Sequence, residues 1–213
     1  MKATPPAPMN GRKAQAARND QVILEAARAV FVADPGAPVS AVAERAGVGI
    51  SALYRRYAGK EDLLRKLCAD GLKRYIAEAE AALADEGDPW TAFTAFMRRV
   101  VDADVHSLTI NLAGTFTPTE DLYRDSAHAS ELATRVFDRA RNAGVLRPGL
   151  NVADMAMIFD QLSAVHLGDE TRTSQIRRRY LALILDAMHL TSAEPLPGPA
   201  PDAEEITRRW TAG

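Results

Sequence analysis

The residues most able to do chemistry lie in residues 39–64, which read VSAVAERAGVGISALYRRYAGKEDLL. Ser51, Tyr54 and Arg55 lie close together in this segment. Their hydroxyl and guanidinium groups suit phosphate oxygens, and an arginine can also reach a guanine edge in the major groove. Lys60 and the free N–H groups of the helix that starts beside it could hold another phosphate. The segment therefore predicts contact with double-stranded DNA.

Two short helices joined by a tight turn are needed to position these side chains. Val42, Ala43 and Ala46 form the apolar face of the first helix, and Gly-Val-Gly at 47–49 forms the turn. The second helix is expected from position 50 to about position 57. This arrangement is a helix-turn-helix, whose second helix offers side chains to base edges in the major groove.

The candidate DNA contacts come from both helices, the turn and the start of the next helix. Small residues at the start of the second helix permit a close approach to DNA. Tyr57 shares a face with Leu53, which also favours a place in the core. The candidates are Ser40, Arg45, Gly49, Ile50, Ser51, Ala52, Tyr54, Arg55, Tyr57 and Lys60.

An enzymatic or metal site has little support in the sequence. Asp102 and His106 have the i, i+4 spacing that can hold a metal ion or serve a helical hydrolase, but charged helix surfaces show this spacing often. We identify no nucleophile elbow, phosphate-binding loop or metal cluster. Cys68 is the only cysteine, so no intramolecular disulfide can form. We expect no enzyme, metal or cofactor.

Composition predicts an all-α protein of about nine helices. The 213 residues are 47% hydrophobic but only 6% aromatic, and no strand pattern interrupts the helical periodicity. Residues 1–60 hold nine Lys/Arg and four Asp/Glu, a net charge of +5, whereas the rest of the chain carries −7. A basic N-terminal part on an acidic remainder suggests that only the former meets a polyanion.

Breaks in the periodicity predict the domain organisation. No apolar run approaches the ~20 residues of a membrane span, and no secretory signal opens the chain, so a soluble cytoplasmic protein is expected. The expected parts are a disordered basic arm (1–14), a helix-turn-helix domain (15–62), a helical ligand-binding and dimerisation domain (63–191) and a Pro-rich tail (192–213).

The helix-turn-helix strongly resembles that of tetracycline-repressor-like (TetR/AcrR) regulators. The matching residues are ILEAARAVF at 23–31, Val42-Ala43, Ala46 to Gly49, Leu53-Tyr54, Tyr57 and Lys60 to Leu63. Gly49 replaces a common capping Ser, and Ala52 replaces a common Thr that could contact phosphate or thymine. The resemblance covers about residues 15–66. It implies a three-helix DNA-binding domain, a fourth linking helix, and a helical domain whose last two helices form a dimeric four-helix bundle.

Two further sets of residues follow from this reading. The apolar face of the last helix either packs within the monomer or pairs with a second copy, and it contains Tyr180, Leu181, Ile184, Leu185 and Met188. Ligand cavities are mostly apolar. Aromatic and other apolar residues of this kind more often form ordinary core than pocket wall. The pocket candidates are Phe93, Phe96, Met97, Val101, Phe116, Tyr123, Phe137, Met155 and Phe159.

The predicted function is that of a homodimeric repressor that binds a palindromic operator and is released by a small apolar effector. Ligand would favour a conformer that holds the two DNA-binding domains at the wrong separation. The alternatives are a transcriptional activator and a module that sequesters a ligand without binding DNA.

Overall fold

The computed structural model describes residues 11–104, 116–189, 195–202 and 204–205, with only the backbone for residues 11–17. These residues contain eight helices and no strand, so the predicted all-α class is confirmed. The chain divides into two compact units, Met1–Leu67 and Cys68–Gly213, which we call the head and the body. None of the described helices is long and apolar enough to cross a membrane.

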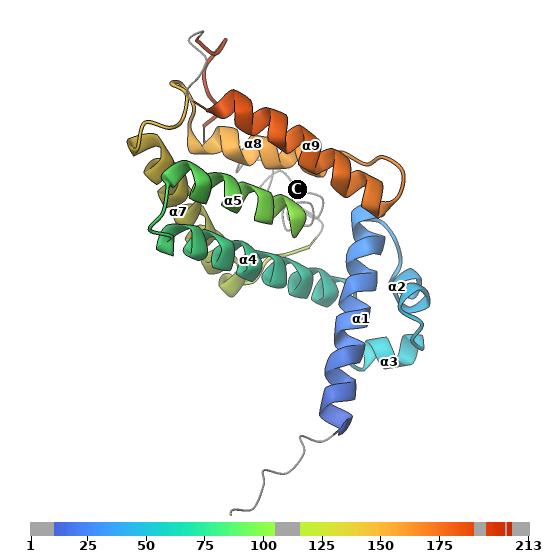
Figure 1. Ribbon diagram of the computed structural model, residues 1–213. Helices are drawn as coiled ribbons and strands as arrows, with labels where there is room; N and C mark the ends of the chain where they lie inside the picture. Colours follow the sequence, from blue (N-terminus) through green and yellow to red (C-terminus); the bar gives the residue numbers. More distant parts are fainter. Residues whose placement is uncertain (1–10, 105–115, 190–194, 203, 206–213) are drawn as a thin grey trace, which may run out of the picture. The chain divides into compact units, whose positions relative to one another are not determined.

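The head contains α1 (Gly11–Ala33), α2 (Val39–Ala46), α3 (Ile50–Tyr54) and the first turns of α4 (Lys60–Ala84) (Figure 1). Helix α2 packs against α1, and α3 packs against α2. Helix α1 begins inside the range that the sequence assigned to a disordered arm, so that part of the expectation is corrected: residues 11–14 are helical. The rest of the expected arm, residues 1–10, lies outside the described residues.

Turn chemistry sets the ends of the short helices in the head. After α1, the carboxylate of Asp34 accepts from the Gly36 N–H at 2.8 Å, which stabilises the turn. Helix α2 ends at Gly47, whose φ of +64° lies in the left-handed region that favours glycine. The N–H of Val48 then donates to Ala43 O at 3.0 Å, which closes the last turn of α2 together with the Gly47 N–H that donates to the same carbonyl.

Helix α3 is shorter than predicted. It ends at Tyr54 rather than near Tyr57, because the chain tightens into a turn in which both Arg56 N–H and Tyr57 N–H donate to Leu53 O, at 2.9 and 3.0 Å. Leu53 itself is fully buried. The bend therefore follows directly after the core residue that anchors α3.

The body contains α5 (Pro89–Asp102), α7 (Glu120–Asn142), α8 (Val152–Ser163) and α9 (Glu170–Met188), together with the rest of α4. Each of these four helices starts at a side chain that accepts from backbone N–H groups in the first turn, the usual role of an N-cap. The capping residues are Asp88, Thr119, Asn151 and Asp169.

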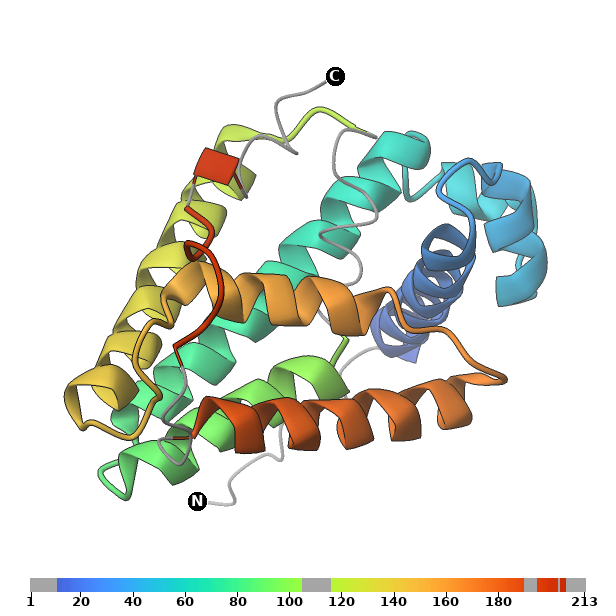
Figure 2. The same cartoon turned by 90° about the horizontal axis from the view of Figure 1, so that it is seen from above.

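The core of the body forms where α5 contacts α7, α8 and α9. Helices α8 and α9 also pack on each other, and Figure 2 shows them side by side in orange and red. The large, fully buried side chains at this contact are aromatic or Met, and each of them fills a large volume of the core. The largest are Phe93, Phe96, Met97, Phe137, Met155 and Phe159.

Three residues of the expected dimer face lie in this core instead. Leu181, Leu185 and Met188 are at most 3% exposed, so they cannot meet a second copy without unfolding the body. The periodic face of α9 thus packs within the monomer, which corrects the assignment of these three residues. Tyr180 is 51% exposed and Ile184 is half-buried.

Candidate functional site

The turn between α2 and α3 and the outer side of α3 form the candidate DNA-facing surface of the head. Tyr54 is 53% exposed and Ile50 is 40% exposed, although both are large. Space is also open above Gly49, where an added Cβ would meet no atom within 4 Å. Of the residues singled out from the sequence, the exposed ones are Ser40, Arg45, Gly49, Ile50, Ser51, Tyr54 and Arg55. Ala52 is half-buried at the edge of this set.

The opposite side of α3 holds it in the head. Leu53 is fully buried, and Tyr57 is only 8% exposed. Tyr57 therefore belongs to the core. Its assignment as a DNA contact is wrong, because little of its ring is exposed. An exposed face backed by two buried anchors is what a rigid reading helix requires.

Lys60 has a different place from the one predicted. Its ammonium donates to Pro35 O at 2.6 Å and to Ala37 O at 3.0 Å, and it lies over the Phe31 ring, 5.2 Å from the centroid. These contacts satisfy carbonyls of the loop between α1 and α2. The assignment of Lys60 as a phosphate contact is therefore wrong, because its ammonium group is bound to these groups of the head.

The adjacent arginines Arg55 and Arg56 have different surroundings. Arg55 is exposed, whereas Arg56 Nη1 pairs with Asp20 Oδ1 at 2.9 Å and so ties the end of α3 to α1. Sequence reasoning missed this positioning contact, because only the fold brings Asp20 near Arg56. Arg55, the C-cap residue of α3, is therefore the better placed of the two arginines to reach DNA.

The pocket candidates in the body separate into core and surface. Phe96 and Phe159 are at most 2% exposed and pack edge to face, with ring centroids 6.4 Å apart. Tyr75, which the sequence did not indicate, meets the same two rings at 5.5 and 6.5 Å, and burial raises the pKa of its hydroxyl. Tyr123 is 63% exposed on α7, so its assignment to an interior pocket is corrected. Val101 and Phe116 are half-buried.

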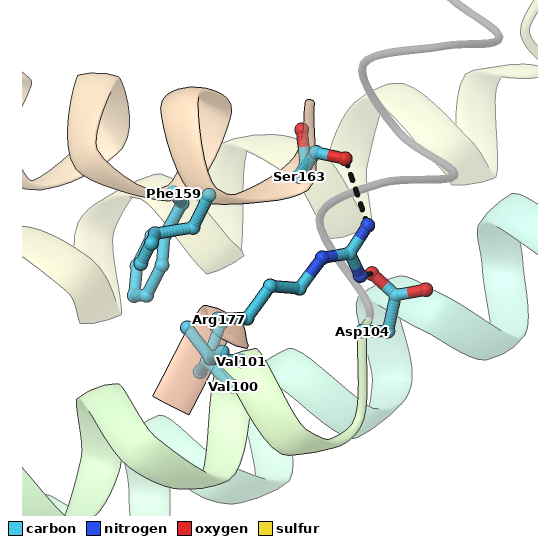
Figure 3. Close-up of a pocket in the computed structure, with 7 residues that line it drawn as sticks. Val100, Val101, Asp104, Phe159, Ser163 and Arg177 are labelled. Atoms are coloured by element: carbon cyan, nitrogen blue, oxygen red, sulfur yellow. Dashed lines mark hydrogen bonds and ion pairs between the residues drawn. The ribbon is translucent and has the colours of Figure 1, made fainter. Parts of the chain in front are cut away.

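A small recess opens in the body between the ends of α5 and α8 and the middle of α9 (Figure 3). Its volume of about 10 Å³ is roughly that of one water molecule. Two of the predicted pocket residues, Val101 and Phe159, line it. The other lining residues are Val100, Asp104, Leu162, Ser163 and Arg177.

Arg177 is the charged centre of this recess, although it is only 6% exposed. Its Nη1 donates to Asp104 Oδ1 at 2.6 Å and its Nη2 to Ser163 O at 2.8 Å (Figure 3). Its Nε donates to Val165 O at 3.2 Å. Sequence reasoning missed this site, because a run of three arginines reads as a solvated helix face. The ion pair joins residues 73 positions apart, which no local pattern reveals.

The structure does not support a role for Asp102 in a metal site or a hydrolase active site. Asp102 Oδ1 accepts from Arg178 Nε at 2.6 Å on the surface of the body, and His106 lies outside the described residues. The described part of the chain has no cluster of three or more potential metal ligands.

Comparisons with known proteins agree with the helix-turn-helix. The family model of the bacterial regulatory proteins of the tetR family matches residues 23–67. The HTH-type transcriptional repressor LfrR of Mycolicibacterium smegmatis is 34% identical over 89 residues, which are 41% of this chain and 44% of the length of LfrR. The match thus spans less than half of that relative.

Solved structures extend the similarity of fold to most of the chain. A TetR transcription regulatory protein from Mycobacterium vanbaalenii is 27% identical, with a TM-score of 0.54 over 84% of this chain and 99% of that one. PfmR, a TetR family transcriptional regulator from Thermus thermophilus, is 21% identical, with a TM-score of 0.59 over 83% and 97%. The structure of LfrR in complex with proflavine is also 21% identical, with a TM-score of 0.57 over 84% and 99%.

The structural likeness covers much more of the chain than the sequence match does. The family model covers the head, where α2 and α3 present their exposed turn. The fold likeness continues through the helices of the body. The head therefore matches the TetR family model over residues 23–67, and the chain has the fold of solved TetR family transcriptional regulators.

Proposed function

We propose that this protein is a ligand-responsive repressor that binds a palindromic operator as a homodimer. In this proposal α3 enters the major groove and a small effector bound in the body releases the DNA. The observation that carries it is the exposure of Tyr54 and Arg55 on a short helix whose other side is anchored by buried Leu53. The repressor LfrR, 34% identical over 89 residues, supports repression rather than activation.

Each exposed group of the head suits a distinct part of DNA. Arg55 can donate to a guanine edge or to a phosphate, and the Tyr54 hydroxyl suits a phosphate oxygen. Small or short side chains at Gly49, Ser51 and Ala52 allow the start of α3 to approach the bases closely. The net charge of +5 over residues 1–60 adds long-range attraction to the phosphate backbone.

The exposed side of α9 supports the proposed homodimer. Tyr180 and Leu183 are 51% and 56% exposed, and they lie three positions apart, which places them on one side of the helix. Ile184 lies beside them, half-buried. Exposed apolar side chains that share one side of a helix suit a contact with the same side of a second copy.

The small size of the recess beside Arg177 supports release by a two-state change. Ligand pockets of ordinary size have roughly 300–1,000 Å³, whereas the recess beside Arg177 holds about 10 Å³. An effector that entered this recess would bind a conformer in which α5 moves away from α8 and α9, and it would stabilise that conformer by its differential affinity. The complex of the fold relative LfrR with proflavine supports an effector of small-molecule size.

Selection of sites from random DNA, followed by a salt titration on the best site, tests this function. The full chain should enrich a palindrome and bind it at least ~10³-fold more tightly than random DNA. The two half-sites should be about one helical turn, ~34–36 Å, apart or slightly more. Weak binding without enrichment and with a steep salt dependence would contradict a specific operator-binding role.

A further inference from the structure

The ion pair between Arg177 and Asp104 is asymmetric in how firmly each partner is held. The Arg177 side chain is 7% exposed and also donates to two backbone carbonyls at the end of α8. The Asp104 side chain is 27% exposed and lies just after the end of α5, where its φ is +48°. Non-glycine residues rarely adopt this left-handed conformation. The guanidinium is thus a fixed group, whereas the carboxylate has access to water.

The surroundings of this pair combine one fixed charge with apolar walls. Val100 and Val101 of α5 and Phe159 and Leu162 of α8 line the same recess. Phe159 in turn contacts the rings of Phe96 and Tyr75. Binding sites for organic molecules have this composition, with a few polar groups that orient a ligand among apolar side chains.

The charges of the recess favour a ligand with a negative charge. A cation that drew the Asp104 carboxylate away from Arg177 would leave the buried guanidinium without its counter-charge, which is strongly unfavourable. An anion can replace the Asp104 carboxylate on Arg177 charge for charge, and at 27% exposure the Asp104 side chain already contacts water. A planar carboxylate also matches the donors of a guanidinium.

We propose that the effector is an apolar organic anion whose carboxylate replaces that of Asp104 on Nη1 of Arg177. The apolar part of the ligand then lies against Val100, Val101 and Phe159. In this exchange Arg177 keeps its bonds to Ser163 O and Val165 O, and the ion pair between α9 and the residue Asp104, just after α5, is lost. This inference rests on the proposed function for the role of the ligand, but the binding itself requires no DNA.

Calorimetric titration of the full chain tests the exchange. The probes are benzoate, 2-naphthoate and decanoate, each paired with its neutral primary amide. The key variant is Asp104→Asn, which keeps the shape of the side chain, tolerates positive φ and removes the competing charge. Asp102→Asn is the matched control, because Asp102 forms a surface pair with Arg178 between the same two helices.

At least one carboxylate should bind the unmodified protein more tightly than its amide does. Asp104→Asn should strengthen binding of that carboxylate at least about tenfold and leave the amide within about threefold. Asp102→Asn should change neither. Arg177→Met should remove the preference for the carboxylate. If that variant does not fold, the comparison of Asp104→Asn with Asp102→Asn decides the question.

Three results would overturn the proposal: no carboxylate binds either protein, Asp104→Asn leaves carboxylate binding unchanged, or it strengthens the amide equally. Operator binding is measured separately with the same probes. If carboxylates bind as expected but leave the DNA bound, regulation by effector fails while the anion site stands. If the neutral amides alone release DNA, independently of Asp104, the anion site fails and the regulatory function stands.

Discussion

The ammonium group of Lys60 lies over the ring of Phe31, 5.2 Å from its centroid, and so joins the start of α4 to the end of α1. The same group donates to Pro35 O and Ala37 O in the loop that leads into α2. One cation thus stabilises a buried aromatic residue and two carbonyls. Lys60 is therefore a positioning residue for the helix-turn-helix.

Replacing Lys60 with Met should destabilise the head without changing the electrostatics of DNA binding. Loss of two charge-assisted hydrogen bonds is expected to lower the free energy of unfolding by about 1.5–3 kcal/mol, measured by urea unfolding. The slope of log K against log salt for operator binding should stay unchanged. A slope lower by about one for each head would instead identify Lys60 as a phosphate contact.

The contacts of Lys60 illustrate what the sequence can and cannot predict at this site. The Gly47 turn and the exposed Tyr54 follow from local chemistry, because glycine and helical spacing act over a few residues. The partners of Lys60 and Arg56 lie on α1 and the loop after it. From sequence alone, a basic residue beside a recognition helix is predicted to contact DNA. Only the fold shows which carboxylates and carbonyls it contacts instead.

Removing the side chain of Arg55 should weaken operator binding while leaving the fold intact. Arg55→Ala is expected to lose about 1–3 kcal/mol of binding free energy for each head if the guanidinium reads a base, with relaxed selectivity at that base pair. Arg124→Ala is the control, because Arg124 is exposed on α7 and pairs with Asp121. Fluorescence anisotropy with the selected operator measures both. Equal affinities of the two variants would contradict the assignment of α3.

Asp88 should make the stability of the body depend on pH in the acid range. The hydroxyl and the N–H of Thr91 both donate to its carboxylate and hold the pKa of Asp88 below its ordinary value of 3.8. A lowered folded-state pKa stabilises the protein above the unfolded pKa, and the effect is lost as pH falls through the folded pKa. Asp88→Ala should therefore lower Tm at pH 7, and this deficit should shrink in acid.

Asp88→Asn provides the control for that experiment. Asparagine is a good N-cap but carries no charge, so its cap should not titrate. Its Tm difference from Asp88→Ala should stay constant from pH 7 down to pH ~2.5, below the ordinary carboxyl range. A deficit of Asp88→Ala that stays equally large in acid would show that the carboxylate charge does not stabilise α5.

Two aromatic residues of α7 belong to the same set of predicted pocket residues, but their truncation should change the free energy of unfolding by very different amounts. Phe137 is fully buried and meets Phe93 edge to face, with ring centroids 6.4 Å apart, whereas Tyr123 is 63% exposed. Phe137→Ala should lower the free energy of unfolding by about 3–5 kcal/mol. Tyr123→Ala should change it by less than about 0.5 kcal/mol. Similar losses in urea unfolding would contradict the packing of α7.

The same distinction explains why the face of α9 was assigned only in part. Helical periodicity groups Leu181 with Leu185 and Met188 whether the stripe meets the monomer core or a second copy. The core of the body takes this stripe, because α5 and α8 pack against it. The residues left for a second copy are those on the other side, Tyr180 and Leu183, where the apolar signal is weaker.

Leu183→Glu should therefore separate the proposed dimer while the monomer stays folded. A carboxylate at a side chain that is 56% exposed is tolerated in the free body, but it has no partner when buried against a second apolar face. Tyr123→Glu places the same charge on exposed α7 and should leave the assembly unchanged. Sedimentation velocity reports the mass and circular dichroism the helix content. If Leu183→Glu sediments as the unmodified protein does, a surface other than this side of α9 must hold the two copies together.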